Sequence, residues 1–103
     1  MKVAVASEGE TEDSKVSQVS GQAPYYLIFE GGKLVKAIKN PFRLGGGAGF
    51  AVARMLVNEK VKQVVAGNFG GNMKMALDDG KVAAKVVTGK TVREAVDAET
   101  KKV

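Results

Sequence analysis

Strand-like and helix-like segments alternate along the second half of the chain, and this alternation constrains the fold more than any other feature. Strands that alternate with helices usually pair in parallel, because the chain must cross over the sheet between them. The expected segments are a helix beginning near Gly49, a strand over 61–66, a helix over 73–79, a strand over 81–87 and a helix beginning at Thr91. These segments predict the parallel half of an α/β fold.

The ends of the last two helices carry recognisable signals. Gly80 follows the 73–79 segment and predicts a left-handed residue that caps the helix C-terminus. Thr91 and Glu94 are three positions apart, the spacing of a capping box at a helix N-terminus. Both signals support the expected helix bounds.

The first half of the chain predicts three further strands. Residues 3–7 are small and apolar without alternation, which is typical of a central strand covered on both faces. Residues 25–30 and 33–39 flank Gly31-Gly32, a pair suited to a tight hairpin turn. Lysines at 33, 36 and 39 suggest that the second hairpin strand lies at a sheet edge. The prediction is an α/β fold with a mixed five-stranded sheet, the first and fourth strands central, and helices on both faces.

Composition limits both the size and the chemistry of the protein. At 103 residues the chain predicts a single domain over 1–103. It contains no cysteine and no histidine, which excludes disulfides, thiolate nucleophiles, imidazole bases and the usual soft metal ligands. We therefore expect no enzyme activity and no metal held by the chain's own side chains. The absence of a long apolar run predicts a cytoplasmic protein without membrane contact.

Two polar loops are the strongest candidates for a binding site. The loop over 8–22 is long for so small a domain, and long loops are often functional. The loop over 67–72 leaves an expected central strand and enters a helix, where open α/β sheets tend to bind ligands. Helix N-termini and glycine amides favour anions there, as does the net charge of +5. We expect one anion pocket where these loops meet.

Other glycine-rich segments carry weaker signals. The run over 45–49 precedes a helix and either acts as a simple hinge or contributes backbone N–H groups to an anion. Gly89-Lys90-Thr91 resembles the end of a phosphate-binding loop, but position 84 is alanine rather than the required glycine. Met73 and Met75 are more typical of packing than of metal ligation. The first expected strand carries no carboxylate, which argues against a two-metal nuclease.

Five features in order resemble the dinitrogenase iron-molybdenum cofactor biosynthesis family, the NifX-like domain also found at the C-terminus of NifB. They are the start at 1–7, the stretch from Val16-Ser17 to Tyr25-Tyr26, Asn40-Pro41, the glycines over 45–49 and the segment over 88–95. The resemblance covers nearly the whole chain and implies a ribonuclease H-like fold. The family typically has Phe-Gly-Arg-Ala-Pro where this chain has Ser20-Gly21-Gln22-Ala23-Pro24, and often Gly-Pro-Asn where it has Gly70-Gly71-Asn72.

The resemblance implies a small carrier or scaffold for an iron–sulfur or iron-molybdenum cofactor precursor, or a related anionic ligand. Cofactor biosynthesis proteins are the implied partners. The alternative is a regulatory or partner-binding module that keeps the fold and binds protein or, less expectedly, nucleic acid through its basic surface. The predicted cofactor-binding residues are Ser17, Ser20, Gly21, Gln22, Gly67, Asn68, Gly70, Gly71 and Asn72.

Overall fold

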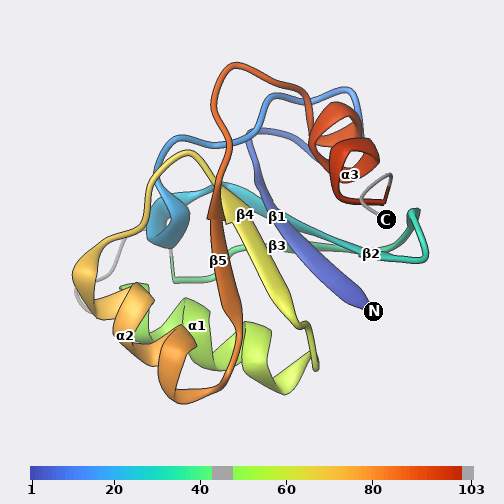
Figure 1. Cartoon of the computed structure of the whole chain (residues 1–103). Coiled ribbons are helices and arrows are strands. Elements are labelled where there is room, and N and C mark those ends of the chain that lie inside the picture. The colour runs from blue at the N-terminus through green and yellow to red at the C-terminus, as the bar shows by residue number, and fades with distance from the viewer. Residues whose placement is uncertain (43–47, 101–103) are drawn as a thin grey trace.

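The computed structural model describes residues 1–42 and 48–100, and within them the chain forms a five-stranded sheet flanked by three helices (Figure 1). The elements are β1 (Lys2–Ser7), the short 3-10 helix η1 (Ser20–Gln22), β2 (Tyr25–Glu30), β3 (Lys33–Lys39), α1 (Ala48–Asn58), β4 (Gln63–Ala66), α2 (Gly71–Asp79), β5 (Ala83–Val86) and α3 (Val92–Thr100). The glycines at 45, 46 and 47 lie outside the described residues. No helix of the described part is long and apolar enough to cross a membrane.

The sheet is mixed, in the order β3-β2-β1-β4-β5. The pairs β1–β2 and β2–β3 are antiparallel, whereas β1–β4 and β4–β5 are parallel. The strands predicted to be central, β1 and β4, are both interior, and the lysine-bearing strand β3 is an edge. The expected α/β fold class and ribonuclease H-like architecture are confirmed.

The hairpin between β2 and β3 forms as its glycines predict. Gly31 and Gly32 have φ values of 60° and 82°, a conformation that only glycine adopts without strain. Two successive positive φ angles match the right-handed twist of the paired strands. The observed strand bounds are the predicted ones, because the turn sets the register on both sides.

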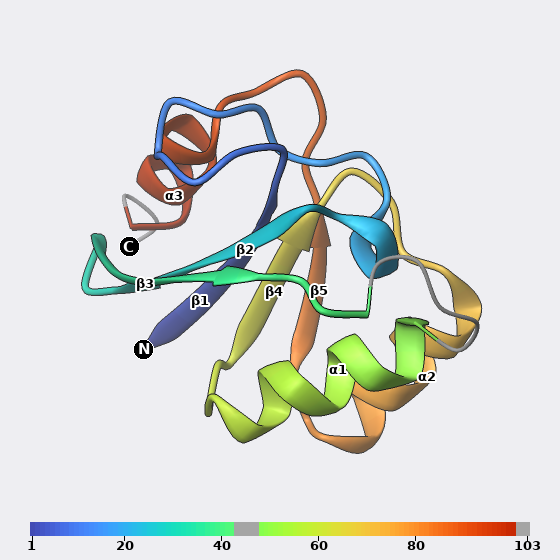
Figure 2. The same ribbon diagram turned by 180° about the vertical axis from the view of Figure 1, so that it is seen from behind.

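Apolar side chains form a separate core on each face of the sheet. Along β1, Ala4 and Ala6 face α1 and α2, whereas Val3 and Val5 face α3. The alanines leave room for two helices to pack side by side on one face, and Figure 2 shows α1 and α2 there together. The valines fill the thinner layer beneath α3 on the other face.

The structure corrects the predicted cap at Gly80. Its φ is −84°, so it is not left-handed; Lys81, the next residue, takes that conformation with φ 60°. The helix ends at Asp79 as predicted, but the Gly80 N–H still donates to the Ala76 carbonyl at 3.1 Å as in a helix, so the left-handed residue is the next one. A Cβ on Gly80 would lie 2.6 Å from a methyl group of Val57 on α1, so a larger residue there would displace that side chain.

The capping box at the start of α3 is present. Thr91 donates its backbone N–H to the Glu94 carboxylate at 2.9 Å, and Glu94 donates its own N–H to the Thr91 hydroxyl at 3.2 Å. These bonds satisfy backbone donors that a helix start otherwise leaves unpaired. The Thr91 hydroxyl also donates to the Glu94 carboxylate, at 3.2 Å. The bonds that the carboxylate accepts from the backbone N–H and the hydroxyl of Thr91 lower the pKa of Glu94, because both favour its charged form.

Glu94→Gln is expected to remove part of the pH dependence of stability. A lowered folded-state pKa means that the stabilisation is complete above the ordinary value of 4.5 and is lost as the pH falls through the folded-state value. Glutamine keeps the capping bond but does not titrate in this range. Urea unfolding between about pH 3 and 6 should show a steeper acid decline for wild type than for the variant. Parallel pH profiles would contradict this assignment.

Candidate functional site

The first predicted loop, over 8–22, turns back from the end of β1. At Ser17 it runs between the carboxyl ends of β1 and β4. Ser17 donates its backbone N–H to the Ala6 carbonyl at 2.8 Å, and its own carbonyl accepts from the Gly67 N–H at 2.8 Å. These bonds extend the sheet beyond its strands. Ser17 and Gly67 are buried as a result, and their amides are not available to a ligand.

The second predicted loop lies directly against the first. A Cβ on Gly67 would sit 2.7 Å from the Cα of Gln18, so only glycine allows this approach. One residue further on, the Asn68 carbonyl accepts from the Ser20 N–H at 3.1 Å. Both ribbon views show the two loops side by side at the carboxyl ends of β1 and β4 (Figures 1 and 2).

The predicted site residues differ in exposure. Ser20 is buried within η1, Gly21 is half-buried and Gln22 is exposed. The remaining predicted residues, on the second loop and the start of α2, are exposed: Asn68, Gly70, Gly71 and Asn72. Phe69 between them is half-buried against the α1–α2 core. Of the nine predicted residues, Ser17, Ser20 and Gly67 are therefore buried, and the other six reach the surface.

Two helix N-termini converge on this surface. A Cβ on Gly21 would lie 3.4 Å from the backbone of Gly49, in the first turn of α1. A Cβ on Gly49 would in turn lie 3.2 Å from the backbone nitrogen of Met73, in the first turn of α2. The sequence suggested Gly49 only as an alternative anion contact. No pattern in the sequence indicated that Gly49 lies close to α2.

The surface presents hydrogen-bond donors, chiefly backbone N–H groups, to a ligand. Gly70, at the α2 N-cap, makes no side-chain cap, and helix N-termini carry partial positive charge from unpaired N–H groups. The Ser20 hydroxyl is buried without a hydrogen-bond partner. Within residues 1–42 and 48–100, no three acidic side chains come together as a metal site, and the chain has neither histidine nor cysteine. The arrangement suits an anion bound by the backbone N–H groups at the helix start.

Two buried side chains hold η1 from beneath. Tyr26 on β2 donates its hydroxyl to the Ser20 carbonyl, and the Asn40 amide donates to the carbonyls of Gly21 and Ala23 at 3.1 and 2.9 Å. The sequence placed Tyr26 in a strand and Asn40 at the end of the hairpin, but neither next to the loops. The pairing of strands β1, β2 and β3 carries both residues under η1.

A surface groove of about 720 Å³ adjoins the site along α1. Its lining includes Phe42 and Phe50, both exposed by more than a third, and Arg54. The backbone N–H of Phe42 donates to the Asn40 side chain at 2.9 Å, which connects the groove to the residues that hold η1. No sequence pattern indicated this groove, because its two walls come from segments that the fold brings together.

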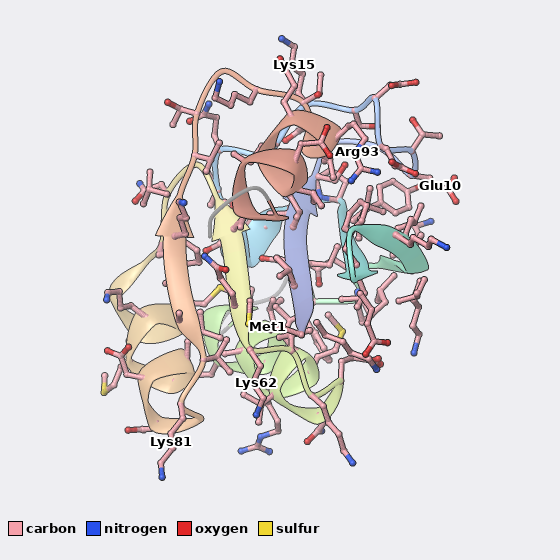
Figure 3. The ribbon with its side chains drawn as sticks, turned by 45° about the vertical axis from the view of Figure 1, so that its right-hand side comes forward. Met1, Glu10, Lys15, Lys62, Lys81 and Arg93 are labelled. Atoms are coloured by element: carbon pink, nitrogen blue, oxygen red, sulfur yellow. The ribbon has the colours of Figure 1, made fainter. Side chains whose placement is uncertain are left out.

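A cluster of charged side chains around Arg93 holds the loop over 8–22 against α3. Arg93 on α3 forms ion pairs with Glu12 at 2.5 Å and Asp97 at 3.1 Å, and donates to the Gly32 carbonyl at 2.8 Å. Figure 3 shows Arg93 at the same end of the molecule as Lys15, and Lys62 and Lys81 at the opposite end. The labelled lysines are thus spread over the molecule and form no single basic face.

Comparison with known proteins places the chain in a family. The family model described as dinitrogenase iron-molybdenum cofactor matches residues 1–102. No curated protein matches the chain.

Solved structures share the fold. A protein from Thermotoga that belongs to the DUF35 family and is provisionally described as a NifB protein is 30% identical, with a TM-score of 0.85 over 98% of this chain and 88% of that one. The apo form of the orange protein from Desulfovibrio gigas is 24% identical, with a TM-score of 0.88 over 95% and 85%. PH0822 is 17% identical, with a TM-score of 0.80 over 97% and 90%. With its family model matched from residue 1 to residue 102, the chain belongs to the dinitrogenase iron-molybdenum cofactor family.

Proposed function

We propose that this protein is a non-enzymatic carrier or scaffold that binds an anionic iron–sulfur or iron-molybdenum cofactor precursor. The site is the surface formed by η1, the loop over 67–70 and the first turns of α1 and α2. The observation that carries the proposal is the convergence of two helix N-termini on η1, through Gly21, Gly49 and Met73. Family membership supports a small cofactor-binding protein.

The electrostatics of the site favour a negatively charged ligand. Each helix N-terminus contributes about 0.3–1 kcal/mol to the binding of an anion, more where the contact is partly buried. Two such ends lie next to each other here, because Gly49 of α1 is close to Met73 of α2, and the whole chain carries a net charge of +5. A diffusing anion is attracted by the net charge and then held by the directed N–H groups.

The donor set determines how a metal cluster would be held. Cysteine and histidine are absent from the chain, so it offers no thiolate or imidazole ligand to a cluster. Sulfide or oxo groups on such a cluster would accept hydrogen bonds from the backbone N–H groups. This fits a cargo that is bound reversibly and passed on intact.

A carrier also agrees with the placement of the methionines. Met73 is buried in the core at the start of α2, whereas Met75 is 54% exposed on the outer side of the helix. A thioether that packs in a core is occupied by its neighbours and is not presented to a metal. We therefore assign the binding to backbone N–H groups rather than to Met73.

The proposal is tested by anaerobic titration with tetrathiomolybdate, a soluble anion of molybdenum and sulfide, followed by amide NMR. The expected result is saturable shifts of the amides at 17–22 and 67–72 and in the first turn of α1. Sodium sulfate at equal ionic strength is the control for a general salt effect. An isolated iron-molybdenum cofactor precursor is then titrated in the same way.

Either outcome is informative. Shifts confined to these segments would support a cofactor carrier that cofactor biosynthesis proteins load and unload. An absence of shifts at several-fold excess of both probes would contradict the proposal. It would favour the alternative, a regulatory or partner-binding module with the same fold. The dispersed lysines make nucleic acid the less favoured partner (Figure 3).

A further inference from the structure

Three carbonyl groups in η1 and directly after it accept hydrogen bonds from buried side chains. Tyr26 donates to the Ser20 carbonyl, and the Asn40 amide donates to the carbonyls of Gly21 and Ala23. Tyr26 is 0% exposed and Asn40 is 4% exposed. The carbonyls of Ser20, Gly21 and Ala23 are therefore satisfied from the protein side.

The two donors are themselves held in one orientation. The Asn40 backbone N–H donates to the Pro24 carbonyl at 3.0 Å, and its side-chain oxygen accepts from the Phe42 N–H at 2.9 Å. A flipped amide would place its oxygen against two carbonyls, so the network allows only one assignment. Burial raises the pKa of the Tyr26 phenol well above its ordinary value, which keeps the hydroxyl protonated as a donor.

Fixing the carbonyls also fixes the direction of the amides. In a helical turn the C=O and N–H groups point to opposite ends of the axis. With its carbonyls held toward Tyr26 and Asn40, η1 directs its N–H end toward the second loop, where Ser20 donates to the Asn68 carbonyl at 3.1 Å. A carbonyl rotated into the candidate site would instead repel an anion.

We propose that Tyr26 and Asn40 are positioning residues that set the anion selectivity of the candidate site by holding the carbonyls of Ser20, Gly21 and Ala23 away from the ligand. This inference rests on the proposed carrier function. It assigns ligand specificity in part to two residues on the β2–β3 hairpin and its end, outside both candidate loops. The competing explanation is that the two side chains only satisfy buried backbone groups and contribute to stability.

The test compares Tyr26→Phe with Tyr25→Phe. The first variant removes the hydroxyl beneath η1 without leaving a cavity, and the second changes the neighbouring tyrosine, which packs on the opposite face of the sheet. Binding of tetrathiomolybdate to Tyr26→Phe is expected to weaken by about threefold to tenfold, the range of one lost hydrogen bond. Tyr25→Phe should bind like wild type.

Two further readouts separate positioning from stability. Hydrogen exchange of the Ser20 amide should accelerate in Tyr26→Phe and not in Tyr25→Phe, because the bond to Asn68 depends on the orientation of η1. The preference for dianionic tetrathiomolybdate over monoanionic perrhenate should fall by about twofold or more, since an exposed carbonyl repels the dianion more strongly. Asn40→Ala, compared with the exposed Asn58→Ala, should act in the same direction.

The outcomes distinguish the two proposals. A wild-type protein that binds no tetrathiomolybdate would contradict the carrier function. A wild type that binds it, together with Tyr26→Phe and Asn40→Ala variants of equal affinity and selectivity, would overturn only the positioning role. Lower melting temperatures with unchanged selectivity would likewise assign Tyr26 and Asn40 to stability alone.

Discussion

Gly67→Ala is expected to destabilise the protein by about 1–3 kcal/mol and to abolish tight contact between the two candidate loops. The added methyl group would lie 2.7 Å from the Cα of Gln18 and 3.1 Å from the Ser17 carbonyl. Both contacts are with backbone, which cannot move aside as a flexible side chain can. The bond from the Gly67 N–H to Ser17 would break as the loops separate. Urea unfolding measures the loss, and tetrathiomolybdate affinity should fall with it.

Gly71→Ala is the matched control. A Cβ at this position meets nothing within 4 Å, and the residue opens α2. Alanine there should be neutral or stabilise by up to about 1 kcal/mol, because it restricts the unfolded chain and favours the helix. Equal losses in the two variants would show that close approach of the loops is not what Gly67 provides.

Met73→Ala is expected to cost about 2–5 kcal/mol in the free energy of unfolding. Met73 is 1% exposed and lies in the core between the sheet and α1, in the turn of α2 that meets Gly49. Truncation leaves a cavity beneath the N-terminus of α2 and loosens the convergence of the two helices. Thermal or urea unfolding reports the stability, and the amide shifts of the first turn of α2 report the local change.

Two variants calibrate this result. Met73→Leu conserves volume and should cost less than about 1.5 kcal/mol. Met75→Ala removes the same side chain two residues away, where it is 54% exposed, and should have almost no effect on stability. If Met75→Ala is as costly as Met73→Ala, the assignment of Met73 to the core is wrong.

Local patterns in the sequence predict most of the secondary structure correctly. Both strands of the hairpin have the predicted bounds, because Gly31 and Gly32 adopt the positive φ angles that their turn requires. The capping box at Thr91 and Glu94 forms as expected, since its bonds join residues three apart. The prediction failed at Gly80: a glycine after a helix suggested a left-handed cap, but Lys81 takes that conformation, and Gly80 lies close to the Val57 side chain on α1.

The candidate site was predictable in part. Loop length and the position of 67–72 after an inner strand singled out both loops as a predicted site, and the structure places the two loops in contact. The sequence could not indicate that Gly49 lies between Gly21 and Met73, because that contact joins three segments far apart in the chain. Nor could it place Tyr26 and Asn40 beneath η1.

The sequence by itself determined the order of strands and helices, the tight hairpin, and the central and edge strands. It also excluded the reactions and metal sites that require cysteine or histidine. These features depend on residues a few positions apart or on composition alone. The tertiary structure decided which backbone groups remain available to a ligand. Pairing between distant segments uses the amides of Ser17 and Gly67, turns the η1 carbonyls toward Tyr26 and Asn40, and brings two helix N-termini to one place.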